Sequence, residues 1–271
     1  MSMDTIPIWA LFAGTTILVV IAIEAGYRLG RAVHRRSEDE KESPVSAITA
    51  SILGLLAFML AFTFGIVSDR YDARKALVRD DANSIRTAYL RSDFLPEPDR
   101  SEAAKLLAIY VDDRLAAVQS HDLDQVNKTL ADAARIQRQL WDMAVVNARK
   151  DMNSDVAALY IESLNELINV HASRVAVGLQ ARIPAGIWLV LFILVILGMI
   201  GVGYQTAIAG STRRSWITPI LAFAFSLVIV LIASLDRPQS GFITVSQQPL
   251  ADLRASMAAD FEARSGLGEK P

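Results

Sequence analysis

The sequence has no cysteine and only three histidines, and these absences exclude several kinds of site. Without thiols, disulfides, thiolate catalysis and cysteine-bound metals are ruled out. The histidines His34, His121 and His171 lack the spacing of metal ligands. The G-x-S-x-G, Walker-loop and H-E-x-x-H motifs of common enzymes are also missing. We therefore predict no catalytic site, no cofactor and no metal, and we do not expect an enzyme.

Neither sign of charge dominates, because the net charge is −2, and so a nucleic-acid partner is not predicted. Hydrophobic residues make up 52% of the chain and form four long runs. Each run is about long enough for a helix to cross a bilayer core of roughly 30 Å. We predict an all-α integral membrane protein with four transmembrane helices in contact with the lipid bilayer. The runs are Ile6–Tyr27, Val45–Ile66, Ala185–Tyr204 and Trp216–Leu235.

A polar insert, residues 67–183, separates the second run from the third, and its apolar residues recur every three or four positions. This period predicts a soluble helical bundle. One helix is expected to continue the second run from about Val45 to Ser92, and Asp99 and Glu102 have the spacing of a capping box for the next. The apolar stripes are typical of a bundle core; contact with a partner protein or another copy is the alternative. The stripes are Val78, Ala82, Ile85, Tyr89, Leu107, Val111, Leu115, Val118, Leu123, Val126, Leu130, Ala133, Ile136, Leu140, Met143, Val156, Tyr160, Leu164, Leu167 and Val175.

The segments that connect the runs bear on membrane orientation. Residues 28–44 and 205–215 form basic hairpin loops, whereas the chain before Ile6 carries no Lys or Arg. The positive-inside rule then places both loops in the cytoplasm, with the insert and both termini outside. The opposite orientation is supported by basic residues directly after the second run, namely Arg70, Arg74, Lys75 and Arg79.

The C-terminal tail, residues 236–271, follows the fourth run. Strand patterns are nearly absent from the chain, and Phe242–Val245 in this tail is the only short candidate.

Phe58, Phe62 and Ile66 lie four residues apart in the second run, so they form one ridge on a helix. Around the axis of an oligomer, such a ridge would stack as hydrophobic rings that can close a pore by dewetting. Ordinary helix packing or lipid exposure is the alternative. Small residues that permit close helix approach are also frequent, including Gly54, Ala57, Gly198, Gly201 and Gly203.

Three stretches resemble a known family. They are Leu56–Phe64, the charged segments Asp69–Arg74 with Asp81–Arg91, and Leu235–Gln247. From about residue 45 to residue 253, the chain is similar to bacterial membrane proteins of the bestrophin-like domain family, a domain of unknown function. The resemblance implies a location in the bacterial inner membrane.

The family name implies a relation to bestrophins, which are pentameric anion channels whose second membrane helix lines a hydrophobic neck. Phe58, Phe62 and Ile66 match that neck in position and spacing. The relation also implies that the insert is cytosolic, opposite to the orientation that the hairpin loops predict. Acidic runs like the calcium clasp of bestrophins are not evident here.

The resemblance also draws attention to polar residues, several just past a membrane end. We predict that they form a polar network at the membrane boundary, in which Asp236 and Arg237 end the fourth helix and pair with the start of the insert; an ion vestibule or ligand site is the alternative. Two functions remain open: an oligomeric ion channel, or a non-catalytic sensor or scaffold whose insert binds a protein partner. The network residues are Asp69, Arg70, Asp72, Arg74, Asn83, Thr87, Arg91, Asp236, Arg237 and Gln247.

Overall fold

The structure is a computed structural model that describes residues 6–35, 42–119, 123–209, 217–237 and 242–267. Predictions for residues 1–5, 36–41, 120–122, 210–216, 238–241 and 268–271 lie outside the described residues. Every regular element in the described ranges is helical, which confirms the all-α class. The strand considered at Phe242–Val245 is not formed; an isolated run of four residues has no neighbouring strand to satisfy its backbone groups.

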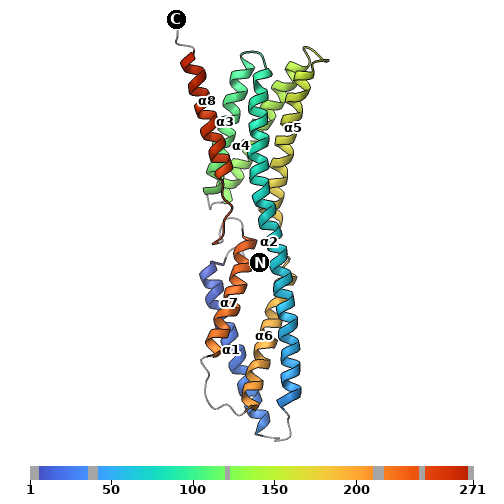
Figure 1. Ribbon diagram of the computed structural model, residues 1–271, viewed down its shortest axis with the longest axis vertical. Coiled ribbons are helices and arrows are strands. Elements are labelled where there is room, and N and C mark those ends of the chain that lie inside the picture. Colours follow the sequence, from blue (N-terminus) through green and yellow to red (C-terminus); the bar gives the residue numbers. More distant parts are fainter. Residues whose placement is uncertain (1–5, 36–41, 120–122, 210–216, 238–241, 268–271) are drawn as a thin grey trace. The chain divides into compact units, whose positions relative to one another are not determined.

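The chain divides into two compact units. Unit 1 is Met1–Tyr71 with Arg182–Thr244, and unit 2 is Asp72–Ala181 with Val245–Pro271; both are helical (Figure 1). Unit 1 is built from α1 (Ile8–His34), the first part of α2 (Glu42–Arg91), α6 (Ala185–Ile208) and α7 (Ile217–Asp236). Unit 2 is built from the rest of α2, η2 (Ser92–Phe94), α3 (Asp99–Gln119), α4 (Leu123–Ala148), α5 (Asp155–Val175), η3 (Ala176–Gln180) and α8 (Gln248–Leu267).

The four helices of unit 1 are long and apolar enough to cross a membrane. α1 and α6 run past the predicted ends of their runs, to His34 and Ile208, so the loop expected at residues 28–44 is shorter. Hydropathy indicates where a helix leaves the lipid. The helix itself continues beyond that point as long as its residues favour the helical conformation. α1 therefore continues through Arg28 and Arg31, which are exposed.

α2 is one helix of 50 residues, which confirms the predicted continuation of the second run into the insert. It tightens into the 3-10 turn η2 just before Pro96. Proline has no backbone N–H group, so it cannot continue the hydrogen bonds of the helix. The capping box predicted at Asp99 is wrong. Asp99 is already helical and accepts a hydrogen bond of 2.6 Å from Asn147 Nδ2, while the Glu97 carboxylate accepts from Ser101 Oγ at 2.8 Å.

Most residues of the predicted apolar stripes form the core of unit 2, as expected for a bundle, whereas Val156 is 43% exposed. Tyr110, Ile136 and Tyr160 are among its fully buried side chains. The tail adds α8, which the sequence analysis did not anticipate. Leu250, Leu253 and Met257 of α8 are buried in the same core, and α8 packs beside α3 (Figure 1).

In unit 1, α1 crosses α6 at very short range. A Cβ atom added to Gly203 would lie 2.0 Å from the Ile23 carbonyl oxygen, and one added to Gly26 would lie 2.0 Å from the Ile200 oxygen. Gly201 meets Thr49 of α2. The prediction that the glycines of the third run allow close helix approach is therefore confirmed.

Candidate functional site

The predicted ridge on α2 lies on a face that its own chain leaves open. Phe58 and Phe62 are 64% and 58% exposed, and their rings stack with centroids 6.4 Å apart. Ile66, the third predicted member, is half-buried. Only 22% of the most apolar stretch of α2 is buried, against 50% for α7. α2 is therefore the span with most surface left for lipid or for another protein chain.

Small residues surround these two phenylalanines. A Cβ atom added to Gly54 or Gly65 would have no atom within 4 Å, and Ala57 and Ala61 are exposed. The glycines of α6 behave differently, because each of Gly198, Gly201 and Gly203 faces a neighbouring helix of the same chain. Gly54 and Gly65 thus face no other helix within the described part of unit 1.

Part of the predicted boundary network is present in unit 1. Asp236, the last residue of α7, accepts a hydrogen bond of 3.1 Å from the Ile183 backbone N–H and lies 3.5 Å from Arg70 Nη1. Arg237 Nη1 donates to the Ile6 carbonyl oxygen at 2.6 Å. Asp236 and Arg237 are only 6% and 3% exposed. In unit 1, the end of the fourth helix therefore lies against Arg70, close to the start of the insert.

The other members of that network belong to both units. Asp69 and Asp72 are exposed, and Arg74 is buried. Asn83, Thr87 and Arg91 line a pocket of unit 2, and Gln247 binds a buried ionic cluster. The ten residues therefore divide between the two units, with four in unit 1 and six in unit 2.

The buried ionic cluster centres on Asp81 of α2, which is completely buried. Arg114 of α3 binds both carboxylate oxygens, with Nη2 3.2 Å from Oδ1 and 3.0 Å from Oδ2. Arg174 of α5 donates to the same carboxylate and, at 2.5 Å, to Gln247 Oε1. Such paired and hydrogen-bonded charges are the form in which ionic groups tolerate burial. The cluster joins α2, α3 and α5 to the segment before α8.

Two guanidiniums around one carboxylate leave the cluster with an excess positive charge. The guanidinium of Arg114 also lies 5.5 Å from the centre of the Tyr110 ring, and His171 packs against that ring. Burial, with the nearby Arg114 and Arg174, lowers the pKa of His171 to about 4, although Asp81 opposes this shift. His171 is therefore neutral at pH 7, as expected of a core histidine.

Asp81, Arg114 and Arg174 were not among the predicted site residues. A usable signal was present, because Asp81 lies inside an apolar stripe, three residues after Val78 and four before Ile85. A charged residue on the buried face of a helix needs a partner of opposite charge. Which arginines supply it depends on how the helices pack.

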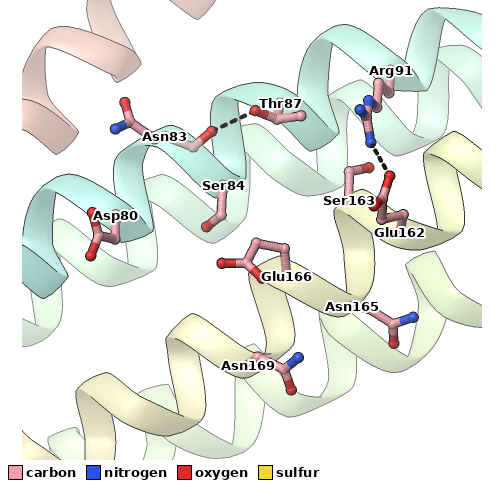
Figure 2. Close-up of a pocket in the computed structure, with 10 residues that line it drawn as sticks. All are labelled: Asp80, Asn83, Ser84, Thr87, Arg91, Glu162, Ser163, Asn165, Glu166 and Asn169. Carbon is pink, nitrogen blue, oxygen red and sulfur yellow. Dashed lines mark hydrogen bonds and ion pairs between the residues drawn. The ribbon is translucent and has the colours of Figure 1, made fainter.

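A polar pocket of about 530 Å³ lies between α2 and α5. Figure 2 shows Asp80 and Ser84 of α2 and Glu166 of α5 pointing into the space between the helices. Arg91 Nη1 donates to the Leu159 carbonyl oxygen at 2.7 Å and lies 3.4 Å from Glu162 Oε2. The complete lining is Asp80, Asn83, Ser84, Thr87, Arg91, Glu162, Ser163, Asn165, Glu166 and Asn169.

Helices long enough to span a membrane, together with a helical unit, define a multi-pass membrane protein. The sequence matches the model of the Bestrophin-like domain over residues 13–250. The chain therefore belongs to the Bestrophin-like domain family, which confirms the resemblance seen in the sequence. A search of curated proteins finds no match.

Solved structures show the same fold. One is a crystal structure of a bacterial bestrophin homologue from Klebsiella pneumoniae with a tryptophan-to-alanine mutation. Its TM-score is 0.65 and its sequence identity is 15%, and the match covers 96% of this chain and 98% of that chain. A second is the same homologue with a leucine-to-threonine mutation. It has a TM-score of 0.63 and 16% identity, and the match covers 92% of this chain and 97% of that chain. At this identity the similarity establishes the fold of the chain.

Proposed function

We propose that this protein is a homo-oligomeric anion channel of the bacterial inner membrane, with the apolar part of α2 lining the central axis. One observation carries the proposal. Phe58 and Phe62 stack on an exposed face of α2, beside Gly54 and Gly65, whose Cα positions have open space next to them. Small residues let helices of neighbouring copies approach closely, and the phenylalanines would then surround a narrow apolar opening that closes when water leaves it. Ile66 would extend this constriction.

Family membership supports both an oligomer and an anion as the permeating ion, since the related bestrophins are pentameric anion channels. The activity needs no catalytic group and no cofactor. For orientation, we retain the expectation from the basic hairpin loops, which places unit 2 and both termini outside. Single cysteines in this cysteine-free chain can test it: a cysteine at the exposed Met152 of unit 2 should react with an impermeant thiol reagent in intact cells. Reaction only after lysis would place unit 2 in the cytoplasm.

The channel is tested by native mass spectrometry in a mild detergent, followed by planar-bilayer recording of the full-length protein. We expect a closed oligomer and an anion current that Phe62→Ala alters severalfold. Phe64→Ala is the matched control, because Phe64 is also exposed on α2 but lies roughly 160° around the helix from Phe62. A monomer, or equal effects of the two substitutions, would refute the proposal.

The alternative is a non-catalytic membrane sensor or scaffold that binds a protein partner through unit 2. The polar pocket between α2 and α5 favours this function, because an open polar groove can recognise a ligand or another protein. The full-length protein with Asn169→Trp in the pocket lining would then lose its partner in a pull-down. In bilayer recordings, the protein would add no current to that of the empty bilayer.

A further inference from the structure

The pocket between α2 and α5 gives unit 2 an acidic flank. Some of the carboxylates that line it are not engaged in ion pairs or hydrogen bonds within the part of the chain that the structure describes. Its lining holds three carboxylates and one guanidinium. Arg91 is engaged with Glu162 and the Leu159 carbonyl, whereas the carboxylates of Asp80 and Glu166 make no ion pair or hydrogen bond with any residue that the structure describes. Both residues are exposed, and both point into the groove (Figure 2). The groove therefore carries a net negative charge, and Asp80 and Glu166 have no positively charged partner among the residues that the structure describes.

α2 carries a second, basic flank. Lys75, Arg79 and Arg86 are exposed and form no ion pair within the described part of the chain. At 100° per residue, they lie roughly 100° to 140° around the helix axis from Asp80. The acidic groove and the basic flank are thus different surfaces on either side of the outward face of α2. They cannot neutralise each other within one copy.

We propose that the two flanks meet between neighbouring copies, so that Arg79 and Arg86 of one copy enter the acidic groove of the next. This inference rests on the proposed oligomer and specifies the contact that closes it. A cyclic oligomer whose subunits meet head to tail needs two different, complementary surfaces on each subunit. If both subunits used the same surface for the contact, Arg79 and Arg86 would instead face the same two residues of the neighbouring copy. Like charges would then repel each other.

The chemistry of the groove suits arginine. A guanidinium donates several hydrogen bonds in a plane and pairs in a bidentate way with a carboxylate. Asp80 and Glu166 supply the carboxylates, and the side-chain carbonyls of Asn165 and Asn169 supply further acceptors along α5. The volume of about 530 Å³ leaves room for long side chains. A neighbouring copy would therefore pair with Asp80 and Glu166, which have no partner in the described part of the chain.

Charge reversal tests the contact in the full-length protein by native mass spectrometry in a mild detergent. Arg79→Glu with Arg86→Glu should lower the oligomeric fraction by roughly tenfold, because like charges then face each other. Asp80→Arg with Glu166→Arg should do the same, and the variant with all four changes should regain the wild-type fraction. Lys128→Glu with Arg138→Glu, two exposed changes on α4, is the control and should leave the oligomer intact.

The outcomes separate this inference from the proposed function. A monomeric wild type would refute both. An oligomeric wild type that resists all the reversals would refute only the inter-copy contact. The oligomer could also be lost only in Asp80→Arg with Glu166→Arg and not be restored by the variant with all four changes. This result would overturn the contact, because the groove would then hold another occupant, such as a free organic cation.

Thiol crosslinking gives an independent readout, because the chain has no cysteine of its own. Arg86→Cys and Glu166→Cys copies, carrying tags of different length, are co-expressed and treated with a short bifunctional thiol reagent. Mixed dimers should form, whereas Arg86→Cys alone should give none, since a head-to-tail contact never places a residue against itself. Self-crosslinking of Arg86→Cys, or no mixed dimer from an intact oligomer, would refute the contact.

Discussion

The close crossing of α1 and α6 makes a sharp prediction about stability. Gly203 and Gly26 each face a backbone carbonyl of the other helix, and a Cβ atom at either position would lie 2.0 Å from that oxygen. Ordinary van der Waals contact begins near 3.4 Å. Alanine at position 203 would therefore force the two helices apart by about 1.4 Å, the difference between these distances. No rotamer change can relieve this, because the contacted atoms belong to the backbone.

We expect Gly203→Ala to destabilise unit 1 by about 1–3 kcal/mol, the usual cost of overpacking a well-packed contact. For a chain of this size, each kcal/mol corresponds to roughly 2–4 °C in the unfolding temperature. Thermal unfolding in a mild detergent, followed by far-ultraviolet circular dichroism, measures the shift. Gly26→Ala should behave in the same way, since it meets the Ile200 oxygen at the same crossing.

The same two helices supply matched controls. Gly186 of α6 and Gly14 of α1 have no atom within 4 Å of an added Cβ, so alanine there changes only helix propensity. Both controls should be as stable as the wild type or slightly more stable. If Gly203→Ala unfolds at the same temperature as Gly186→Ala, the two helices do not cross at the distance described, and the reasoning fails.

Three further predictions concern unit 2. Asp81→Asn removes the only carboxylate from the ionic cluster and should cost about 3–5 kcal/mol, because two buried guanidiniums lose their counter-charge; the exposed Asp142→Asn should stay within about 0.5 kcal/mol of the wild type in the same denaturant titration. The pKa of His171 is about 4 in the folded protein against an ordinary value of 6.5, so the unfolded chain takes up the proton first as the pH falls. The stability should therefore be highest above pH 6.5 and should decline between pH 6.5 and 4, by about 1–2 kcal/mol after allowing for partial exposure of the ring. His171→Gln should flatten this decline, and an unchanged pH profile would contradict the assignment. Leu253→Ala opens a cavity under α8 and should cost about 2–5 kcal/mol, seen as faster amide exchange throughout α8, whereas the exposed Ser256→Ala should leave exchange unchanged.

The features that could be predicted from the sequence are those set by local patterns. Hydropathy and helical period located the four apolar helices, the long helix from Glu42 to Arg91 and the core stripes of unit 2. The tail helix followed the same rule but was overlooked, although Leu250, Leu253 and Met257 are spaced by three and four residues. The exact ends of α1 and α6 were less accessible, because helix continuation and lipid contact are different properties.

The polar contacts were harder to predict because they join residues distant in sequence. Asp81 meets Arg114 and Arg174 only after α2, α3 and α5 have packed together. Arg70 lies 3.5 Å from Asp236, a pairing that the sequence can suggest because both residues lie at the ends of apolar runs. Gln247 belongs to unit 2 and accepts a hydrogen bond from Arg174, a contact that proximity to a membrane end in the sequence does not reveal.

α2 carries both surfaces that a neighbouring copy would contact, and they rely on different physics. In lipid, the apolar face gains no hydrophobic free energy by meeting another helix and depends on close packing at small residues such as Gly54 and Gly65. In water, the charged flanks of unit 2 are screened by salt and are individually weak. Because one helix holds both surfaces, forming either contact raises the effective concentration of the other. The oligomer should therefore weaken with rising salt without dissociating fully, and bulky residues at Gly54 should make it far more sensitive to salt. Equal salt sensitivity in the wild type and Gly54→Leu would show that the two contacts do not act together.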